Sequence, residues 1–171
     1  NAGVEGTSGR LDLRTGAASR GASGPVTVTS GNAISGSGGD IQIVVGLGDS
    51  GAGGAVALNA GDSSAPAAEG GAVVLQTGHG HAASGSMSIA TVDSGTDGAS
   101  GEIALTTGDA AVGAAGRVQL STGFSQRAAA GDLDLRVGDS SSGTGAMVNV
   151  VAGRASGDGA TGGRVHISAG L

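Results

Sequence analysis

Bulky aromatic side chains are almost missing from this sequence. Trp and Tyr are absent, and Phe124 is the single phenylalanine among 171 residues. Globular cores normally owe a large share of their buried area to aromatic side chains. Here Gly supplies 38 residues, and the apolar content is almost entirely Ala, Val, Leu and Ile. We therefore expect a thin structure built on aliphatic residues.

Cys and Lys are also absent, which excludes disulfide bonds, thiolate metal sites and a Walker-type phosphate loop. All eight basic residues are Arg, the formal net charge is −6, and no basic stripe is present. Such a chain is a poor candidate for binding nucleic acid. No apolar run approaches the roughly 20 residues that cross a bilayer. We expect no nucleic-acid partner and no membrane insertion.

What the sequence does contain is a tandem repeat. An eight-residue pattern recurs in the order Gly, any residue, aliphatic, any, aliphatic, any, small, Gly, and 101–108 is its clearest copy. Repetition at a fixed period is typical of repeat architectures. The eleven copies follow one another at steps of 14 to 17 residues and begin at Gly9, Gly24, Gly39, Gly54, Gly71, Gly85, Gly101, Gly116, Gly131, Ala146 and Gly163.

The array runs through 1–171 without a distinct terminal repeat. Solenoids that stand alone need polar capping repeats at both ends. We interpret 1–171 as one uncapped array, a segment of a longer tandem-repeat polymer. The alternative is that capping segments lie outside this sequence.

The two aliphatic residues of each repeat are two positions apart, which is the period of a β-strand. This predicts an all-β fold, a parallel β-solenoid (β-helix) of about eleven 15-residue coils with corners rich in Gly, Ala and Ser. Glycines at the strand ends are expected to take positive φ at the corners. The alternative is an antiparallel β meander, which would need unusually long hairpin loops. In the solenoid, a structural ladder would form from Ile103, Leu105, Val118, Leu120, Leu133 and Leu135.

One charge pattern fits this register. The residues after the leading Gly in three successive repeats are Glu102, Arg117 and Asp132. Coils stacked in parallel would place them in an acid–base–acid ladder, which avoids like charges across neighbouring strands. Each exposed pair is worth only about 0–1 kcal/mol, so the pattern indicates register more than stability.

Few residues are candidates for chemistry. Asp62, Asp93, Asp109 and Asp139 open inter-repeat segments and are weak calcium candidates, although capping of nearby backbone N–H groups is the favoured interpretation. A His79-Gly-His81 pair lacks the further ligands of a metal site. No catalytic or cofactor-binding set is present, and we expect no enzyme activity and no cofactor.

The repeat, as in Gly54-Ala-Val-Ala-Leu-Asn-Ala-Gly61, resembles the Gly/Ser-rich tandem repeats of secreted and cell-surface proteins in algae and other protists. The resemblance implies an extracellular structural or adhesive polymer. The period also resembles that of insect β-solenoid antifreeze proteins. Their outward Thr-x-Thr occurs here only at Thr27 and Thr29, and positions such as Asp134 and Arg136 replace it elsewhere.

We therefore expect a non-catalytic structural segment of an extracellular fibre or cell-surface filament. Its partners would be other copies or neighbouring repeats of a longer chain. The alternative function is a binding module, either a carbohydrate-binding adhesin stalk with glycan partners or a weak ice-binding protein. Segments rich in Ser and Thr, such as 140–144, are candidate sites of O-glycosylation.

Overall fold

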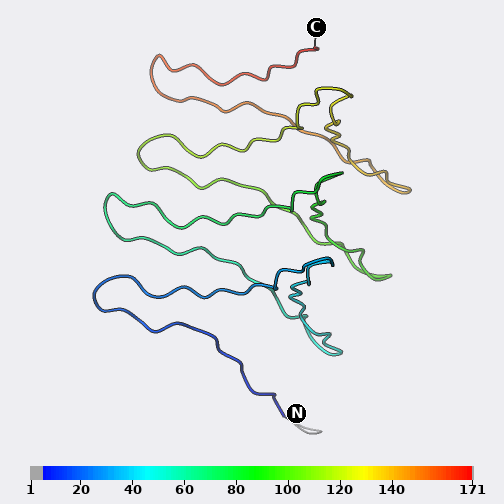
Figure 1. The fold of residues 1–171 in the computed structure, drawn as a ribbon. Helices are drawn as coiled ribbons and strands as arrows, with labels where there is room; N and C mark the ends of the chain where they lie inside the picture. Colours follow the sequence, from blue (N-terminus) through cyan, green and yellow to red (C-terminus); the bar gives the residue numbers. More distant parts are fainter. Residues whose placement is uncertain (1–5, 171) are drawn as a thin grey trace. The chain divides into compact units, whose positions relative to one another are not determined.

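The structure, a computed structural model, describes residues 6–170, and none of these residues lies in a helix or a β-strand. Figure 1 accordingly draws a smooth trace without coiled ribbons or arrows. The predicted all-β fold is wrong, both as a parallel β-solenoid and as an antiparallel meander. The chain is coil-like. Residues 1–5 and 171 of the predicted array lie outside the described residues.

The chain has no buried core among the residues that the structure describes. Its accessible surface is 17267 Å². A compact protein of 15.6 kDa would expose about 7,300 Å², and a fully extended chain of that mass about 22,600 Å². The surface is therefore much closer to that of an extended chain than to that of a folded domain.

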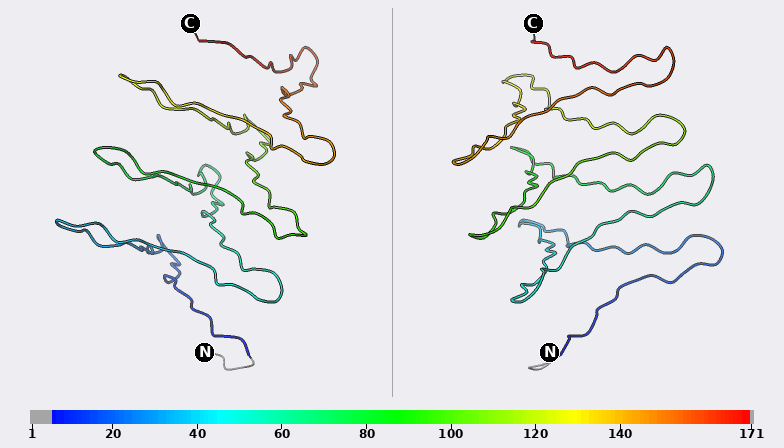
Figure 2. Two further views of the ribbon diagram at one scale, coloured as in Figure 1. Left: turned by 90° about the vertical axis from the view of Figure 1, so that its right-hand side faces the viewer. Right: turned by 180° about the vertical axis from the view of Figure 1, so that it is seen from behind.

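The chain divides between Met87 and Ser88 into two units, and each is built from the same parts. Extended segments that correspond to the repeats alternate with bends, as both views in Figure 2 show. One bend falls between each repeat and the next. The bends lie at 19–21, 34–36, 49–51, 65–67, 81–82, 96–97, 111–113, 126–128, 141–143 and 157–159.

Three loops are closed at their base by a backbone hydrogen bond between two glycines. The leading Gly71 donates its N–H to the carbonyl of Gly61, the closing residue of the preceding repeat, at 2.8 Å. Gly85 donates to Gly78 and Gly163 to Gly153 in the same way, both at 2.9 Å. The two glycines of the repeat therefore meet across the loop that separates consecutive repeats.

Side-chain space explains why several of the repeats begin with Gly. A Cβ on Gly101 or Gly116 would lie 3.3 Å from the methyl carbon of the Thr at the seventh position of the preceding repeat. On Gly54 it would lie 2.7 Å from Cγ1 of Val45. Gly at these leading positions therefore avoids a close contact with the seventh residue of the preceding repeat, whereas a Cβ on Gly131 would meet nothing within 4 Å.

Positive φ angles occur within the loops and not at the ends of the repeats. Gly113 has φ 106° and Gly143 has φ 90°, and both lie at bends between repeats. These angles favour glycine because a Cβ would clash with the backbone there. The expectation that the glycines at the ends of each repeat carry them is wrong.

The repeat pattern failed to predict the fold for a physical reason. Alternation of apolar and polar residues requires an extended backbone, but a β-strand also needs a neighbouring strand about 4.8 Å away. In the described residues, consecutive segments hydrogen-bond only at loop bases, as at Gly71 and Gly61. Extended conformation is therefore present without the ladder.

Candidate functional site

The aliphatic pairs, which are the third and fifth residues of each repeat, form the main exposed apolar feature. Every one of these side chains is at least half exposed. The third residue is the more sheltered of the two in most repeats, with Ile103 at 51% and Leu105 at 71%. The pairs therefore present apolar surface to the solvent at intervals of about 15 residues.

The predicted structural ladder is not a buried seam. Ile103 and Val118 are 51% and 56% exposed, and the solenoid that would have covered them does not form. The other expected members are more open to solvent, with exposures of 57–71%, and they are Leu105, Leu120, Leu133 and Leu135. These residues are regularly spaced in the sequence, but the fold does not bury them against one another.

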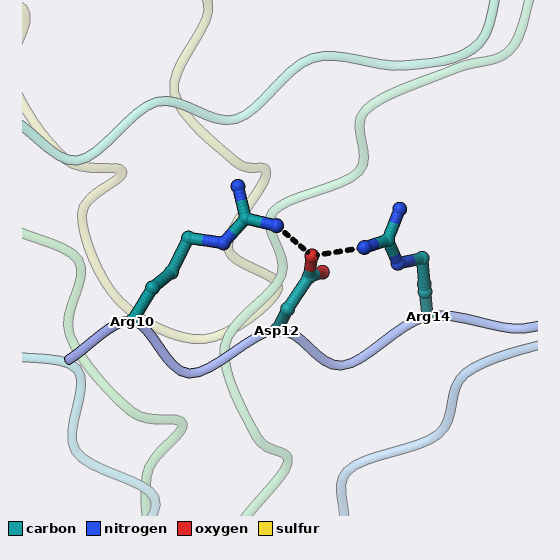
Figure 3. A network of polar contacts seen from close by, with 3 residues as sticks. All are labelled: Arg10, Asp12 and Arg14. Carbon is teal, nitrogen blue, oxygen red and sulfur yellow. Dashed lines mark hydrogen bonds and ion pairs between the residues drawn. The ribbon is translucent and has the colours of Figure 1, made fainter.

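The second, fourth and sixth residues of each repeat form a mixed and mostly polar face, which we call the polar face and which also exposes Val44, Val74, Met147 and Val151. This face carries the ion pairs of the described chain. Arg10 and Arg14 both contact the same carboxylate oxygen of Asp12, each at 2.5 Å (Figure 3). Arg136 pairs with Asp134, and its Nε donates to Oδ1 at 3.0 Å. Residues two apart share a side because the backbone is extended. Such exposed pairs contribute about 0–1 kcal/mol each.

The charge ladder expected from Glu102, Arg117 and Asp132 joins three separate repeats. Within residues 6–170 these side chains make no ion pair with one another. All three are exposed. Their alternating signs are thus available to an external partner.

The calcium candidates Asp62, Asp93, Asp109 and Asp139 lie in four different inter-repeat segments, all exposed. Across the described part of the chain, no group of three His, Cys, Asp or Glu residues is placed to hold a metal ion. His79 and His81 lie on either side of Gly80 and acquire no third ligand of this kind.

Serine hydroxyls make hydrogen bonds inside the loops, a role that was not predicted from the sequence. Ser94 Oγ donates to the carbonyl of Gly98 at 2.7 Å, and Ser140 Oγ donates to that of Ser142 at 2.6 Å. Ser125 Oγ accepts from the N–H of Ala128 at 3.2 Å. The available signal was the placement of Ser one to three residues after a repeat ends, where its hydroxyl bonds locally with the backbone.

No concave site accompanies these features in residues 6–170, where no pocket was detected. Several apolar loop side chains are also exposed, including Phe124 at 90% and Val112 at 97%. Unlike the aliphatic pairs, they do not recur at a fixed position of the repeat.

Across the same residues, no helix has the length and apolar character needed to span a bilayer. Comparisons with protein-family models, with curated proteins and with solved structures gave no match to this chain.

Proposed function

We propose that this chain is a non-catalytic structural segment of an extracellular fibre or cell-surface filament, in which it associates with other copies of itself. The observation that carries the proposal is the exposure of the aliphatic pairs in every repeat. Soluble monomers rarely leave so much regularly placed apolar surface uncovered, and uncovered surface of this kind marks an interaction site.

The repeat number favours association between long arrays. Burying one aliphatic side chain stabilises a complex by roughly 1.5–3 kcal/mol, and each repeat offers two. Ordering the flexible chain opposes this gain, especially at glycine. Once one repeat is engaged, the next binds as an intramolecular event at high effective concentration. An array can therefore associate where a single repeat would not.

The backbone supports the same proposal. Extended segments with unpaired N–H and C=O groups are templates for pairing with another chain. The described residues contain many such segments, because all of their backbone hydrogen bonds lie within the loops or at the loop bases. The extracellular location rests on the resemblance of the repeats to those of secreted and surface proteins.

The test is a concentration series of the purified chain, followed by sedimentation and electron microscopy. We expect filaments above a threshold concentration. A variant with Ile103, Leu105, Val118 and Leu120 all changed to Ser should raise that threshold at least a thousandfold, because roughly 6 kcal/mol or more of burial is lost and about 1.4 kcal/mol corresponds to tenfold.

The matched control changes four exposed apolar loop residues, Ile34, Leu47, Val112 and Phe124, to Ser. It removes a comparable amount of apolar surface, and its threshold should stay within about threefold of the unchanged chain. A chain that remains monomeric at every concentration would contradict the proposal, as would equal effects of the two variants.

A further inference from the structure

The charges of the polar face are arranged so that two copies of this chain fit best when they are out of register. All ten charged residues of this face are exposed. They are Arg10, Asp12, Arg14, Asp40, Glu102, Arg117, Asp132, Asp134, Arg136 and Arg164. In-register parallel pairing of two copies would place each of them beside its own counterpart, and like charges directly opposite one another are destabilising.

A shift of one repeat removes every such conflict. Glu102 then lies beside Arg117 of the other copy, and Arg117 beside Asp132. The remaining charged positions face neutral residues, as with Asp134 beside Asn149. The aliphatic pairs stay aligned because any whole-repeat shift brings third positions to third positions. A shift of two repeats also forms two opposite-charge pairs, Arg10 with Asp40 and Asp132 with Arg164, but it places the like charges of Glu102 and Asp132 side by side.

The three alternating charges of the polar face are accessible to a second copy of the chain. Glu102, Arg117 and Asp132 are exposed and make no ion pair with one another within residues 6–170. The polar face projects from an extended backbone, as the Arg10, Asp12 and Arg14 side chains illustrate (Figure 3). An extended segment of this kind can pair with a parallel neighbour about 4.8 Å away.

We propose that copies of this chain associate side by side in parallel, with each copy displaced by one repeat from the next. The inference rests on the proposed function and adds the register of the contact. In a displaced contact the two copies pair through different repeats, which makes the contact heterologous. Each copy therefore keeps an unpaired repeat that a further copy can join. Contacts that do not close on themselves generate open filaments.

Cross-linking measures the register directly, since the chain has no cysteine of its own. The two single variants Ala104→Cys and Gln119→Cys change neutral, exposed fourth positions of adjacent repeats. Mixed in equal amounts, assembled and oxidised, they should give the mixed disulfide at least tenfold above either same-site disulfide. Adjacent strands hold Cα atoms within the range of about 4.4–6.8 Å that a disulfide spans.

Charge reversal gives a second measurement. Arg117→Glu places like charges against both Glu102 and Asp132, and should raise the threshold concentration on the order of tenfold. Reversing all three, with Glu102→Arg, Arg117→Glu and Asp132→Arg, should restore it. The control Arg127→Glu makes the same change of net charge within a loop and should have little effect.

The outcomes separate the two proposals. Filaments with mixed disulfides and a restored triple variant support the one-repeat displacement. Filaments with same-site disulfides, with no preference, or with no disulfide at either position overturn it and leave the fibre proposal standing. Failure to assemble at any concentration overturns both.

Discussion

The hydrogen bond between Gly71 and Gly61 offers a sensitive test of how the repeats are joined. Gly71 donates its N–H to Gly61 at 2.8 Å, and a Cβ on Gly71 would lie 3.1 Å from the Gly61 nitrogen and 3.4 Å from its oxygen. Both contacts are to backbone, which cannot rotate away as a side chain can. Gly71→Ala should therefore push the loop base apart by a few tenths of an ångström.

The expected size follows from the value of one such bond. A typical hydrogen bond contributes about 0.5–1.5 kcal/mol, so losing it should lower the protection of amide 71 against hydrogen exchange by about two- to tenfold. The matched control is Gly85→Ala, because Gly85 makes the equivalent bond to Gly78 at 2.9 Å. Its nearest contact to a new Cβ would be the Thr77 Cβ at 3.5 Å, an ordinary van der Waals distance.

The assay is amide hydrogen exchange by nuclear magnetic resonance on dilute protein, with each rate corrected for the intrinsic rate of the new residue. We expect amide 71 to lose protection in Gly71→Ala and amide 85 to keep it in Gly85→Ala. Equal losses in both variants, or no loss in either, would refute the argument that close approach at the loop base requires Gly71.

Three further predictions concern single positions. In Gly80→Ala the new Cβ would overlap the carbonyl oxygen of Ala83, so the backbone chemical shifts of 79–83 should change strongly. The control Gly78→Ala places its Cβ in open space and should leave those shifts almost unchanged. Similar changes in both variants would contradict this prediction. Asp12→Asn removes the negative charge that Arg10 and Arg14 share. Exposed ion pairs contribute only about 0–1 kcal/mol, so the backbone shifts of 9–16 should change little, and loss of the extended conformation there would be inconsistent with that value. Calorimetric titration with Ca²⁺ should show no binding site tighter than about 1 mM. The reason is that each of four separate loops offers a single carboxylate, from Asp62, Asp93, Asp109 and Asp139. A tighter site would show that these loops converge.

The sequence was sufficient to predict the segmentation of this chain. The bends at 111–113 and 126–128 lie in the segments between repeats, rich in Gly, Ala and Ser, where corners were predicted. The exposure of the polar face also follows from the pattern, since Arg10, Asp12 and Arg14 project to one side of an extended backbone (Figure 3). These features depend only on local sequence.

Pairing between repeats could not be predicted in this way. The alternation at Ile103 and Leu105 is satisfied equally by a strand within a sheet and by an extended segment without neighbours. What decides between them is whether the gain from burying two modest aliphatic side chains per repeat exceeds the cost of ordering glycines. The sequence pattern contains no measure of that balance.

The candidate site shows the same division. The aliphatic pairs and the alternating charges of Glu102, Arg117 and Asp132 are visible in the sequence, and the sequence interpretation assigned them to contacts within one chain. The exposure of Val118 at 56% shows that the chain itself does not cover them. The loop hydrogen bonds of Ser94 and Ser140 were missed because short polar loops offer many equivalent local partners.

Hydrogen exchange of the amides of 103–107, compared between dilute and assembled protein, tests the central claim most directly. The claim is that the repeats are uncovered in the single chain and become covered by other copies. These residues have no backbone ladder in the described chain, so their amides should exchange at close to intrinsic rates in dilute solution. In filaments they should become protected by at least a hundredfold. Strong protection of these amides in the dilute monomer would contradict the account, because it would mean that the chain covers its own repeats.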